Sequence, residues 1–107
     1  MVIEQYAVYW VDLNPTQGSE ISKVRPCVII SPKELNDNLN TVIIIPITST
    51  LRNYPFRIRC TLANKTGEIV TDQIRTVDKS RLRSKMSKLS GQEIEKLREI
   101  LNEMLCQ

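Results

Sequence analysis

The chain runs through short segments rich in β-branched and aromatic residues, each bounded by a polar turn, and it closes with one amphipathic stretch. We predict strands over residues 6–13, 26–30, 41–48, 56–62, 68–71, 73–77 and 85–89. Short strands that follow one another directly favour an antiparallel arrangement. With a single helix at the end, this order predicts a mainly β (α+β) fold, a small and strongly curved antiparallel barrel.

Two segments define the expected core of the sheet. Residues 41–48 (Thr-Val-Ile-Ile-Ile-Pro-Ile-Thr) are the most strongly strand-forming, and we expect them at the centre. The uninterrupted apolar run 27–30 indicates a strand that is buried on both faces. Because Pro46 cannot donate a ladder hydrogen bond, we expect a bulge or a sheet edge at that position.

The segment 56–62 alternates apolar and polar residues, which predicts one face on the core and one in water. The expected inward set is Phe56, Ile58, Cys60 and Leu62, and the expected outward set is Arg57, Arg59 and Thr61. The residues that follow, 64–67, are Asn, Lys, Thr and Gly, and they predict a turn.

Two capping boxes mark the predicted helix starts. Ser31-Pro32-Lys33-Glu34 and Ser90-Gly91-Gln92-Glu93 each place Ser at the N-cap and Glu three residues later. The first opens a short helix to about residue 36, and residues 78–82 predict a single helical turn between strands. The second opens an amphipathic C-terminal helix. Its apolar stripe consists of Ile94, Leu97, Ile100, Leu101, Met104 and Leu105.

The length of 107 residues suits one modest core, so we expect a single domain over 1–107. The three cysteines are odd in number and widely spaced, which argues against a disulfide framework, and Cys27 is expected in the core. The first residues lack the pattern of a signal peptide, and no window approaches the length of a membrane span. We therefore expect a cytoplasmic protein with no membrane partner.

The chain contains no histidine, the commonest general acid/base and the commonest metal ligand. Its cysteines form no C-x-x-C pair, and neither a Walker loop nor a G-x-G-x-x-G motif occurs. We therefore expect no metal and no cofactor. Any catalysis has to use arginine, lysine, carboxylate or hydroxyl side chains.

Charge is unevenly distributed although the net charge is only +3. Residues 52–65 contain four basic side chains and no acid, residues 75–88 contain six basic side chains and one acid, and the last fifteen residues are mildly acidic. A basic region in the middle of the chain concentrates polyanions. A solvated basic face without a partner explains this charge distribution equally well.

The stretch 18–31 joins a polar loop to a buried strand. Arg25 stands directly before Pro26, which favours an extended backbone at the strand entrance. A guanidinium fixed at the rim of a rigid strand suits phosphate recognition. An ordinary hairpin with solvated charges is the alternative. At the end of the strand 41–48, the hydroxyls of residues 48–50 either stabilise a turn or bind a phosphate.

Several motifs occur in a characteristic order along nearly the whole chain. They are Asp12-Leu13-Asn14-Pro15, Gly18-Ser19-Glu20, Arg25-Pro26 leading into Val28-Ile29-Ile30-Ser31-Pro32, Pro46-Ile47-Thr48-Ser49, and Asp72-Gln73-Ile74-Arg75-Thr76-Val77-Asp78-Lys79 with Arg81-Leu82. Singly each motif is weak. In this order, with a terminal helix, the chain resembles the MazF/PemK family of toxin endoribonucleases.

The resemblance implies an SH3-like barrel that forms a symmetric homodimer and cuts single-stranded mRNA at short sequences. It implies a metal-free reaction that leaves a 2′,3′-cyclic phosphate and a 5′-hydroxyl. It also implies a cognate antitoxin that lays a flexible, acidic segment across the RNA-binding groove. The implied catalytic residues are Arg25 and Thr48, and the implied substrate-binding residues are Gly18, Ser19, Glu20, Lys23, Ser49 and Gln73.

The chemistry of these residues agrees with the resemblance at most points. Cleavage by the 2′-hydroxyl needs a base, a proton for the leaving 5′-oxygen, and stabilisation of charge on the phosphate oxygens. Arg25 suits charge stabilisation, typically about 3 kcal/mol per donor, and it suits proton donation. It is a poor base because the guanidinium pKa exceeds about 12. The base is therefore unassigned, and Glu20 is the carboxylate to test.

Two other classes of function compete with an endoribonuclease. A gyrase-poisoning toxin family shares this barrel, but it acts through a Trp-containing C-terminus, whereas Trp10 lies in a predicted strand and is the one Trp of the chain. A non-catalytic SH3-like module that binds nucleic acid or protein is the second alternative. We expect a homodimer for the enzyme, because the groove on one small barrel is too shallow to grip several nucleotides.

Overall fold

The computed structural model describes residues 2–106 of the chain. In these residues the elements in order are β1 (Ala7–Asp12), β2 (Val24–Ile29), α1 (Lys33–Asn38), β3 (Thr41–Thr48), β4 (Ile58–Leu62), β5 (Lys65–Ile69), β6 (Arg75–Asp78), the 3₁₀ turn η1 (Lys79–Arg81), β7 (Leu82–Lys88) and α2 (Gly91–Leu105). Every predicted strand has a counterpart. The third has the predicted bounds, and the other six begin or end one to three residues away from theirs.

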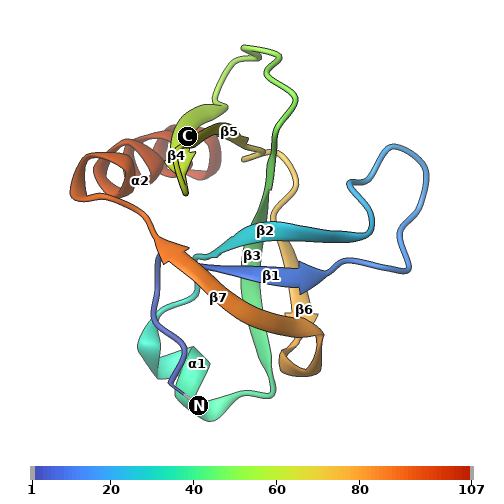
Figure 1. Cartoon of the computed structure of the whole chain (residues 1–107). Helices are drawn as coiled ribbons and strands as arrows, with labels where there is room; N and C mark the ends of the chain where they lie inside the picture. Colours follow the sequence, from blue (N-terminus) through green and yellow to red (C-terminus); the bar gives the residue numbers. More distant parts are fainter. Residues whose placement is uncertain (1, 107) are drawn as a thin grey trace.

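The strands form one curved antiparallel sheet in the order β4-β5-β3-β2-β1-β7, and β6 pairs with β3 beside this path. Figure 1 shows β3 running behind β1 and β2, with β4, β5 and α2 gathered near the end of β3. This arrangement confirms the predicted mainly β, strongly curved antiparallel fold with a C-terminal helix.

The strand β3 is central, as predicted, because it pairs with β2 on one side and with β6 and then β5 on the other. The expected bulge or edge at Pro46 is wrong. Pro46 pairs with Cys27 without a register shift, and its carbonyl accepts a hydrogen bond from the N–H of Val70 (2.9 Å). On that side of β3 the partner changes from β6, last paired at Ile44, to β5, first paired at Ile47. Because Pro46 lies at this change of partner strand, the N–H that proline lacks is not needed for strand pairing.

Buried apolar side chains form two clusters, which take alternate residues of β1, β2 and β3 and so lie on opposite faces of the curved sheet. Cys27 is fully buried in one cluster, as predicted, and Leu97 of α2 is fully buried in the other. The capping box at Ser90 is confirmed, with the Ser90 hydroxyl accepting from the N–H of Glu93 at 3.2 Å. Leu105 is 63% exposed, so the predicted apolar stripe ends one turn earlier.

The predicted capping box at the start of α1 is wrong. Pro32 occupies the N-cap, and no side chain caps the helix. The Ser31 hydroxyl instead donates to Oδ1 of the buried Asn36 (2.5 Å) and accepts from the N–H of Ile43 (3.1 Å). Ser31 therefore ties the helix to β3, and the helix continues two residues past its predicted end, to Asn38.

The alternation predicted over 56–62 is confirmed for the residues of β4 and fails before it. Ile58, Cys60 and Leu62 are buried. Phe56 has φ of +68° and is 42% exposed, because it lies in the turn that precedes the strand. Arg57 was expected in water, but only 12% of its side chain is exposed.

The turn predicted at 64–67 lies slightly earlier. Ala63 and Asn64 have positive φ values and join β4 to β5, while Lys65 is already the first residue of β5.

Burial also determines the chemistry of two thiols. It raises the pKa of Cys27 to about 12 and that of Cys60 to about 12, which keeps both protonated and unreactive at neutral pH. Cys106 is exposed. No helix within residues 2–106 combines the length and the apolar character that crossing a membrane requires.

Candidate active site

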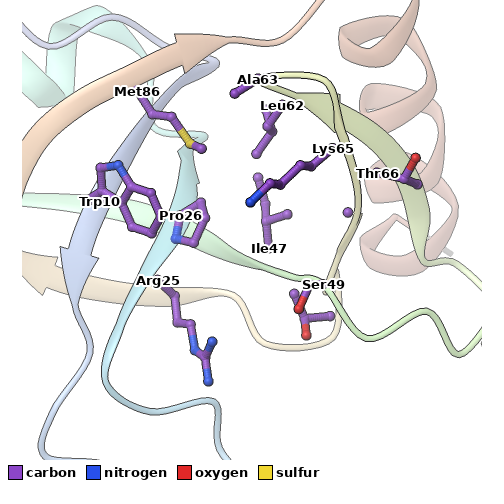
Figure 2. Close-up of a pocket in the computed structure, with 12 residues that line it drawn as sticks. Trp10, Arg25, Pro26, Ile47, Ser49, Leu62, Ala63, Lys65, Thr66 and Met86 are labelled. Atoms are coloured by element: carbon purple, nitrogen blue, oxygen red, sulfur yellow. The ribbon is translucent and has the colours of Figure 1, made fainter.

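A pocket of about 290 Å³ lies where β3 ends, between the β1–β2–β7 part of the sheet and the β4–β5 hairpin. Figure 2 shows its lining in close-up. The lining residues come from six strands and the loops next to them: Trp10, Arg25, Pro26, Ile47, Thr48, Ser49, Leu62, Ala63, Lys65, Thr66, Gly67 and Met86. Both predicted catalytic residues are among them.

The register of β2 on β3 explains why Arg25 and Thr48 line the same pocket. The paired positions run from Ile29 opposite Ile44 to Cys27 opposite Pro46. Continued by two residues, this register sets Arg25 opposite Thr48. Pairing between the strands ends before these residues, so the two strand ends separate around the pocket.

Arg25 belongs to β2 and pairs with Val11 of β1, which confirms the extended backbone predicted before Pro26. Its side chain is exposed, and Nε donates to the carbonyl oxygen of Ser22 (3.2 Å). Within residues 2–106 no Asp or Glu forms an ion pair with it. Figure 2 shows the guanidinium pointing away from the side chains of Trp10, Pro26 and Met86. Its charge is available to a ligand.

The Thr48 hydroxyl stabilises a turn, one of the two roles that the sequence predicts for the hydroxyls of residues 48–50. Its Oγ1 accepts a hydrogen bond from the N–H of Thr50 (3.1 Å). A hydroxyl that accepts one bond still has a proton to donate. The turn therefore orients Oγ1 and leaves its O–H for a partner in the pocket. The next residue, Ser49, is exposed and adds a second hydroxyl on the same wall.

Sequence reasoning missed Lys65 as a residue of this pocket. Figure 2 shows its ammonium group directed into the pocket, toward Pro26 and Ile47. No carboxylate of residues 2–106 pairs with it. Lys65 was missed because the sequence predicts a turn at 64–67, whereas Lys65 is a strand residue opposite Leu62. A two-residue hairpin turn at Ala63-Asn64 is the signal that would have placed Lys65 in the strand.

The apolar part of the pocket was also missed. Trp10 of β1, Pro26 of β2 and Met86 of β7 lie on one side of it. Trp10 and Pro26 are register partners across β1 and β2. A wall of this kind suits the flat face of a base, while cations and hydroxyls at the other end suit a phosphate.

Glu20 and Gln73 lie elsewhere, in a second hollow of about 240 Å³ that Asp72 and Arg75 also line. The carbonyl oxygen of the Gln73 side chain accepts from the N–H of Ile21 (3.0 Å) and so fastens the loop between β1 and β2. The Glu20 carboxylate accepts from the N–H of Gln17 (2.6 Å) within that loop. The structure thus divides the predicted site residues between two neighbouring surfaces.

The other predicted loop residues line neither hollow. Gly18 has φ of +57°, a conformation that glycine adopts without strain, and its position lets the loop turn. Ser19 and Lys23 are exposed on the same loop. Figure 1 shows this loop extending away from the sheet beyond β1 and β2.

The pocket brings together two cations, three hydroxyl-bearing residues and an apolar wall, with no carboxylate in its lining. Within residues 2–106, no three His, Cys, Asp or Glu side chains are grouped so as to hold a metal ion. This combination suits one nucleotide unit of a single-stranded nucleic acid, with its phosphate near Arg25 and Thr48.

Comparisons with known proteins agree with this reading of the fold. The endoribonuclease toxin MazF of Escherichia coli K12 is 27% identical to the chain over 97 residues, which are 90% of the chain and 87% of that protein. Among solved structures, MazF from Deinococcus radiodurans superposes with a TM-score of 0.88 at 23% identity, covering 100% of the chain and 99% of that protein. A mycobacterial endoribonuclease solved in complex with its cognate antitoxin superposes with a TM-score of 0.80 at 20% identity, covering 98% and 94%.

At these identities the solved structures establish the fold. The family is established by a sequence model, described as the PemK-like, MazF-like toxin of type II toxin–antitoxin systems, which matches residues 4–105. The match covers all the strands, both helices and every residue of the pocket. The chain belongs to the PemK-like, MazF-like family of toxins of type II toxin–antitoxin systems.

Proposed function

We propose that this protein is a metal-independent endoribonuclease that cleaves single-stranded mRNA at short sequence motifs. The observation that carries the proposal is that Arg25 and Thr48, from two different strands, line one pocket large enough for a phosphate. The names of the relatives, endoribonuclease toxin MazF and endoribonuclease MazF, support the same activity.

In the proposed reaction the 2′-oxygen of a ribose attacks the adjacent phosphorus. The new bond joins the 2′-oxygen to phosphorus, and the bond from phosphorus to the 5′-oxygen breaks. A base removes the 2′-hydroxyl proton, and the departing 5′-oxygen receives a proton. The products are a 2′,3′-cyclic phosphate and a 5′-hydroxyl, and no oxidant or second substrate is needed.

Arg25 is proposed to stabilise the charge that grows on the phosphate oxygens. Among residues 2–106 its guanidinium has no carboxylate partner, so a phosphate meets a charge that no acid neutralises. A proton from the same group to the leaving oxygen is compatible with its position. Thr48 donates its O–H to a phosphate oxygen while its Oγ1 is held by the N–H of Thr50. Ser49 adds a neighbouring donor.

No acid and no histidine lines the pocket, so its lining offers neither a carboxylate nor an imidazole as the general base. Glu20 accepts a hydrogen bond inside its own loop and lines the neighbouring hollow. Glu20→Gln tests whether Glu20 is the base. If it is, the pH–rate profile of the variant lacks the acidic pKa that the wild-type profile shows. If Glu20 only contacts RNA, the variant binds RNA more weakly and its pH–rate profile is unchanged.

The binding partners follow from the family and the charge of the site. We propose a homodimer, in which two pockets provide a groove long enough for several nucleotides. We also propose a cognate antitoxin whose flexible, acidic segment occupies that groove and pairs with Arg25 and Lys65. Light scattering at the working concentration tests the dimer, and an active monomer contradicts it.

The decisive experiment incubates the protein with a long single-stranded RNA in the presence and absence of EDTA. We expect cleavage in both, fragments whose 5′ ends share a short sequence, and ends that a kinase labels without prior phosphatase treatment. Cleavage that the chelator abolishes and Mg²⁺ restores contradicts the metal-free reaction. Fragments with 5′-phosphates contradict attack by the 2′-hydroxyl.

A further inference from the structure

One carboxylate is buried inside the molecule, away from both hollows. Glu68 lies in β5 and is 1% exposed. Its Oε2 accepts hydrogen bonds from two backbone donors, the N–H of Arg52 (3.2 Å) and the N–H of Asn53 (3.0 Å). Its Oε1 accepts no hydrogen bond from residues 2–106 and lies 3.5 Å from Nη1 of Arg57. A buried carboxylate is costly unless charges and hydrogen bonds compensate it, and here the two backbone donors and the counter-charge all come from the loop that leads into β4.

Glu68 is also the register partner of Thr48 across β3 and β5. The preceding residue packs tightly against the same place: a Cβ at Gly67 would lie 2.9 Å from Cγ2 of Ile47 and 3.3 Å from the carbonyl oxygen of Thr48. The end of β3, which carries the proposed catalytic hydroxyl, is thus paired directly with the strand residue whose side chain is buried.

The chain leaves β3 at Thr48 and reaches Arg52 and Asn53 a few residues later. Glu68 therefore holds this segment at both ends, by strand pairing at Thr48 and by its carboxylate at Arg52 and Asn53. Between the two anchors lie Ser49 and the Thr50 N–H that binds Oγ1 of Thr48. Figure 1 shows the same segment continuing into a loop that projects beyond β4 and β5.

We propose that Glu68 is a positioning residue for the reaction: it fixes the hydroxyl-bearing segment 48–53 so that Thr48 and Ser49 face Arg25 across the pocket. The inference rests on the proposed function for its catalytic consequence. Its structural half, that the carboxylate holds the loop, stands on the contacts of Glu68 alone.

The geometry explains why a carboxylate serves here better than an amide. Every group that faces Glu68 in these contacts is a donor: two backbone N–H groups and a guanidinium. A glutamine keeps one oxygen for the loop but turns an NH₂ group toward Arg57, where two donors meet. An alanine removes both acceptors and leaves the loop N–H groups without a partner.

The catalytic half is tested with Glu68→Ala and Glu68→Gln in the full chain, on the RNA that the wild-type protein cleaves. We expect Glu68→Ala to lower kcat about 100-fold with KM changed less than about threefold, because misplaced hydroxyls weaken the transition state more than ground-state binding. Glu68→Gln keeps the loop acceptor and should retain activity within about tenfold of wild type. Asp37→Asn, on the exposed helix α1, is the matched carboxylate control.

The structural half is tested by amide hydrogen exchange, which does not depend on activity. The N–H groups of Arg52 and Asn53 should be protected in the wild type, protected in Glu68→Gln, and fast in Glu68→Ala. The amide of Leu97, inside α2, reports any general loosening of the fold. If Glu68→Ala does not fold, Glu68→Gln and the wild-type exchange rates still decide the question.

Two results overturn the proposal. Fast exchange of the Arg52 and Asn53 amides in the wild type shows that Glu68 does not hold the loop. Deprotection of both amides in Glu68→Ala with kcat unchanged shows that the loop is held but does not position the hydroxyls. If the wild-type protein cuts no RNA, the proposed function fails instead, and the exchange rates still show whether Glu68 holds the loop.

Discussion

Two arginines near strand entrances are used in opposite ways in this molecule. Arg25 stands directly before Pro26 at the start of β2, and Arg57 stands directly before the first residue of β4. Arg25 is exposed, and within residues 2–106 its side chain donates one hydrogen bond, to the carbonyl oxygen of Ser22. Arg57 is nearly buried and lies between two carboxylates, with Nε 2.9 Å from Oδ1 of Asp72 and Nη1 3.5 Å from Oε1 of Glu68.

The difference lies in what the neighbouring strands bring to each guanidinium. At Arg57, β5 and the turn after it supply two acids, and the ring of Tyr54 lies 4.8 Å from the guanidinium carbon. At Arg25 the neighbours are a proline, apolar residues, hydroxyls and Lys65. A guanidinium whose charge is neutralised inside the fold contributes to stability. One whose charge is left exposed beside a pocket is available for an anion.

Replacing Arg25 with alanine gives the largest expected effect. We expect kcat/KM for RNA cleavage to fall about 1,000-fold, or about 4 kcal/mol in activation free energy, because the main charge facing the phosphate is lost. The free energy of unfolding in urea should change by less than about 0.5 kcal/mol, since the side chain is exposed.

Lys33→Ala removes an exposed positive charge on α1, outside the pocket, and controls for the general loss of a cation. Its cleavage rate should equal that of the wild type. Cleavage by Arg25→Ala at the wild-type rate removes Arg25 from the mechanism.

Replacing Arg57 with methionine should lower the stability of the fold, the property that Arg25→Ala leaves nearly unchanged. Methionine keeps the apolar stem but leaves Glu68 buried without its counter-charge, so we expect unfolding to become easier by about 3 kcal/mol. Urea titration followed by circular dichroism measures this change.

Arg59→Met is the matched control for Arg57→Met. Arg59 lies two residues further along β4, is exposed, and donates to Oδ1 of Asn53 at 2.7 Å. It should cost less than about 0.5 kcal/mol. Equal losses for the two variants contradict the structural role given to Arg57.

The sequence predicts the fold well wherever local periodicity decides it. Residues 41–48 form β3 as expected, and the capping box at Ser90 begins α2. It fails where a turn interrupts a pattern. The alternation over 56–62 reads through Phe56, whose positive φ takes it out of the strand and lets the chain bring Arg57 under its two carboxylates.

The site was predictable in part, for a related reason. Arg25 and Thr48 come from motifs, but their meeting depends on the register of β2 on β3, which no local pattern specifies. Lys65 and Trp10 enter the pocket through the pairing of other strands. The basic middle of the chain predicts either an anion-attracting surface or a solvated basic face, yet Arg57, Lys79 and Arg81 bind carboxylates or backbone carbonyls within the fold. Charge counted along a sequence therefore overstates the charge that a ligand meets.

Thr48 offers a smaller effect on the Arg25 side of the comparison. Thr48→Val removes the hydroxyl and keeps the shape, and we expect kcat to fall about 30-fold, as for one lost hydrogen bond to a charged group. Thr48→Ser keeps the hydroxyl and should stay within about threefold of wild type. Single-turnover cleavage of the same RNA measures both. A serine variant as slow as the valine variant indicates that the methyl group, and not the hydroxyl, is what Thr48 contributes.

The smallest expected effect concerns Asp72, the exposed carboxylate partner of Arg57, whose charge depends on pH. The hydrogen bond from Arg57 holds the pKa of Asp72 below its ordinary value of 3.8. A carboxyl whose pKa is lower in the folded state stabilises that state fully above the unfolded pKa, and the contribution disappears as the pH falls through the folded pKa. Asp72 is 55% exposed, so solvent screens the pair, and we expect Asp72→Asn to cost only about 0.5 kcal/mol at pH 7. Urea unfolding of the wild type and the variant should differ by that amount from pH 7 down to about pH 5 and converge below pH 3. A difference that persists at low pH means that the shape of the Asp72 side chain, and not its charge, holds Arg57 on that side. Glu68 would then be the one acid whose charge distinguishes the surroundings of Arg57 from those of Arg25.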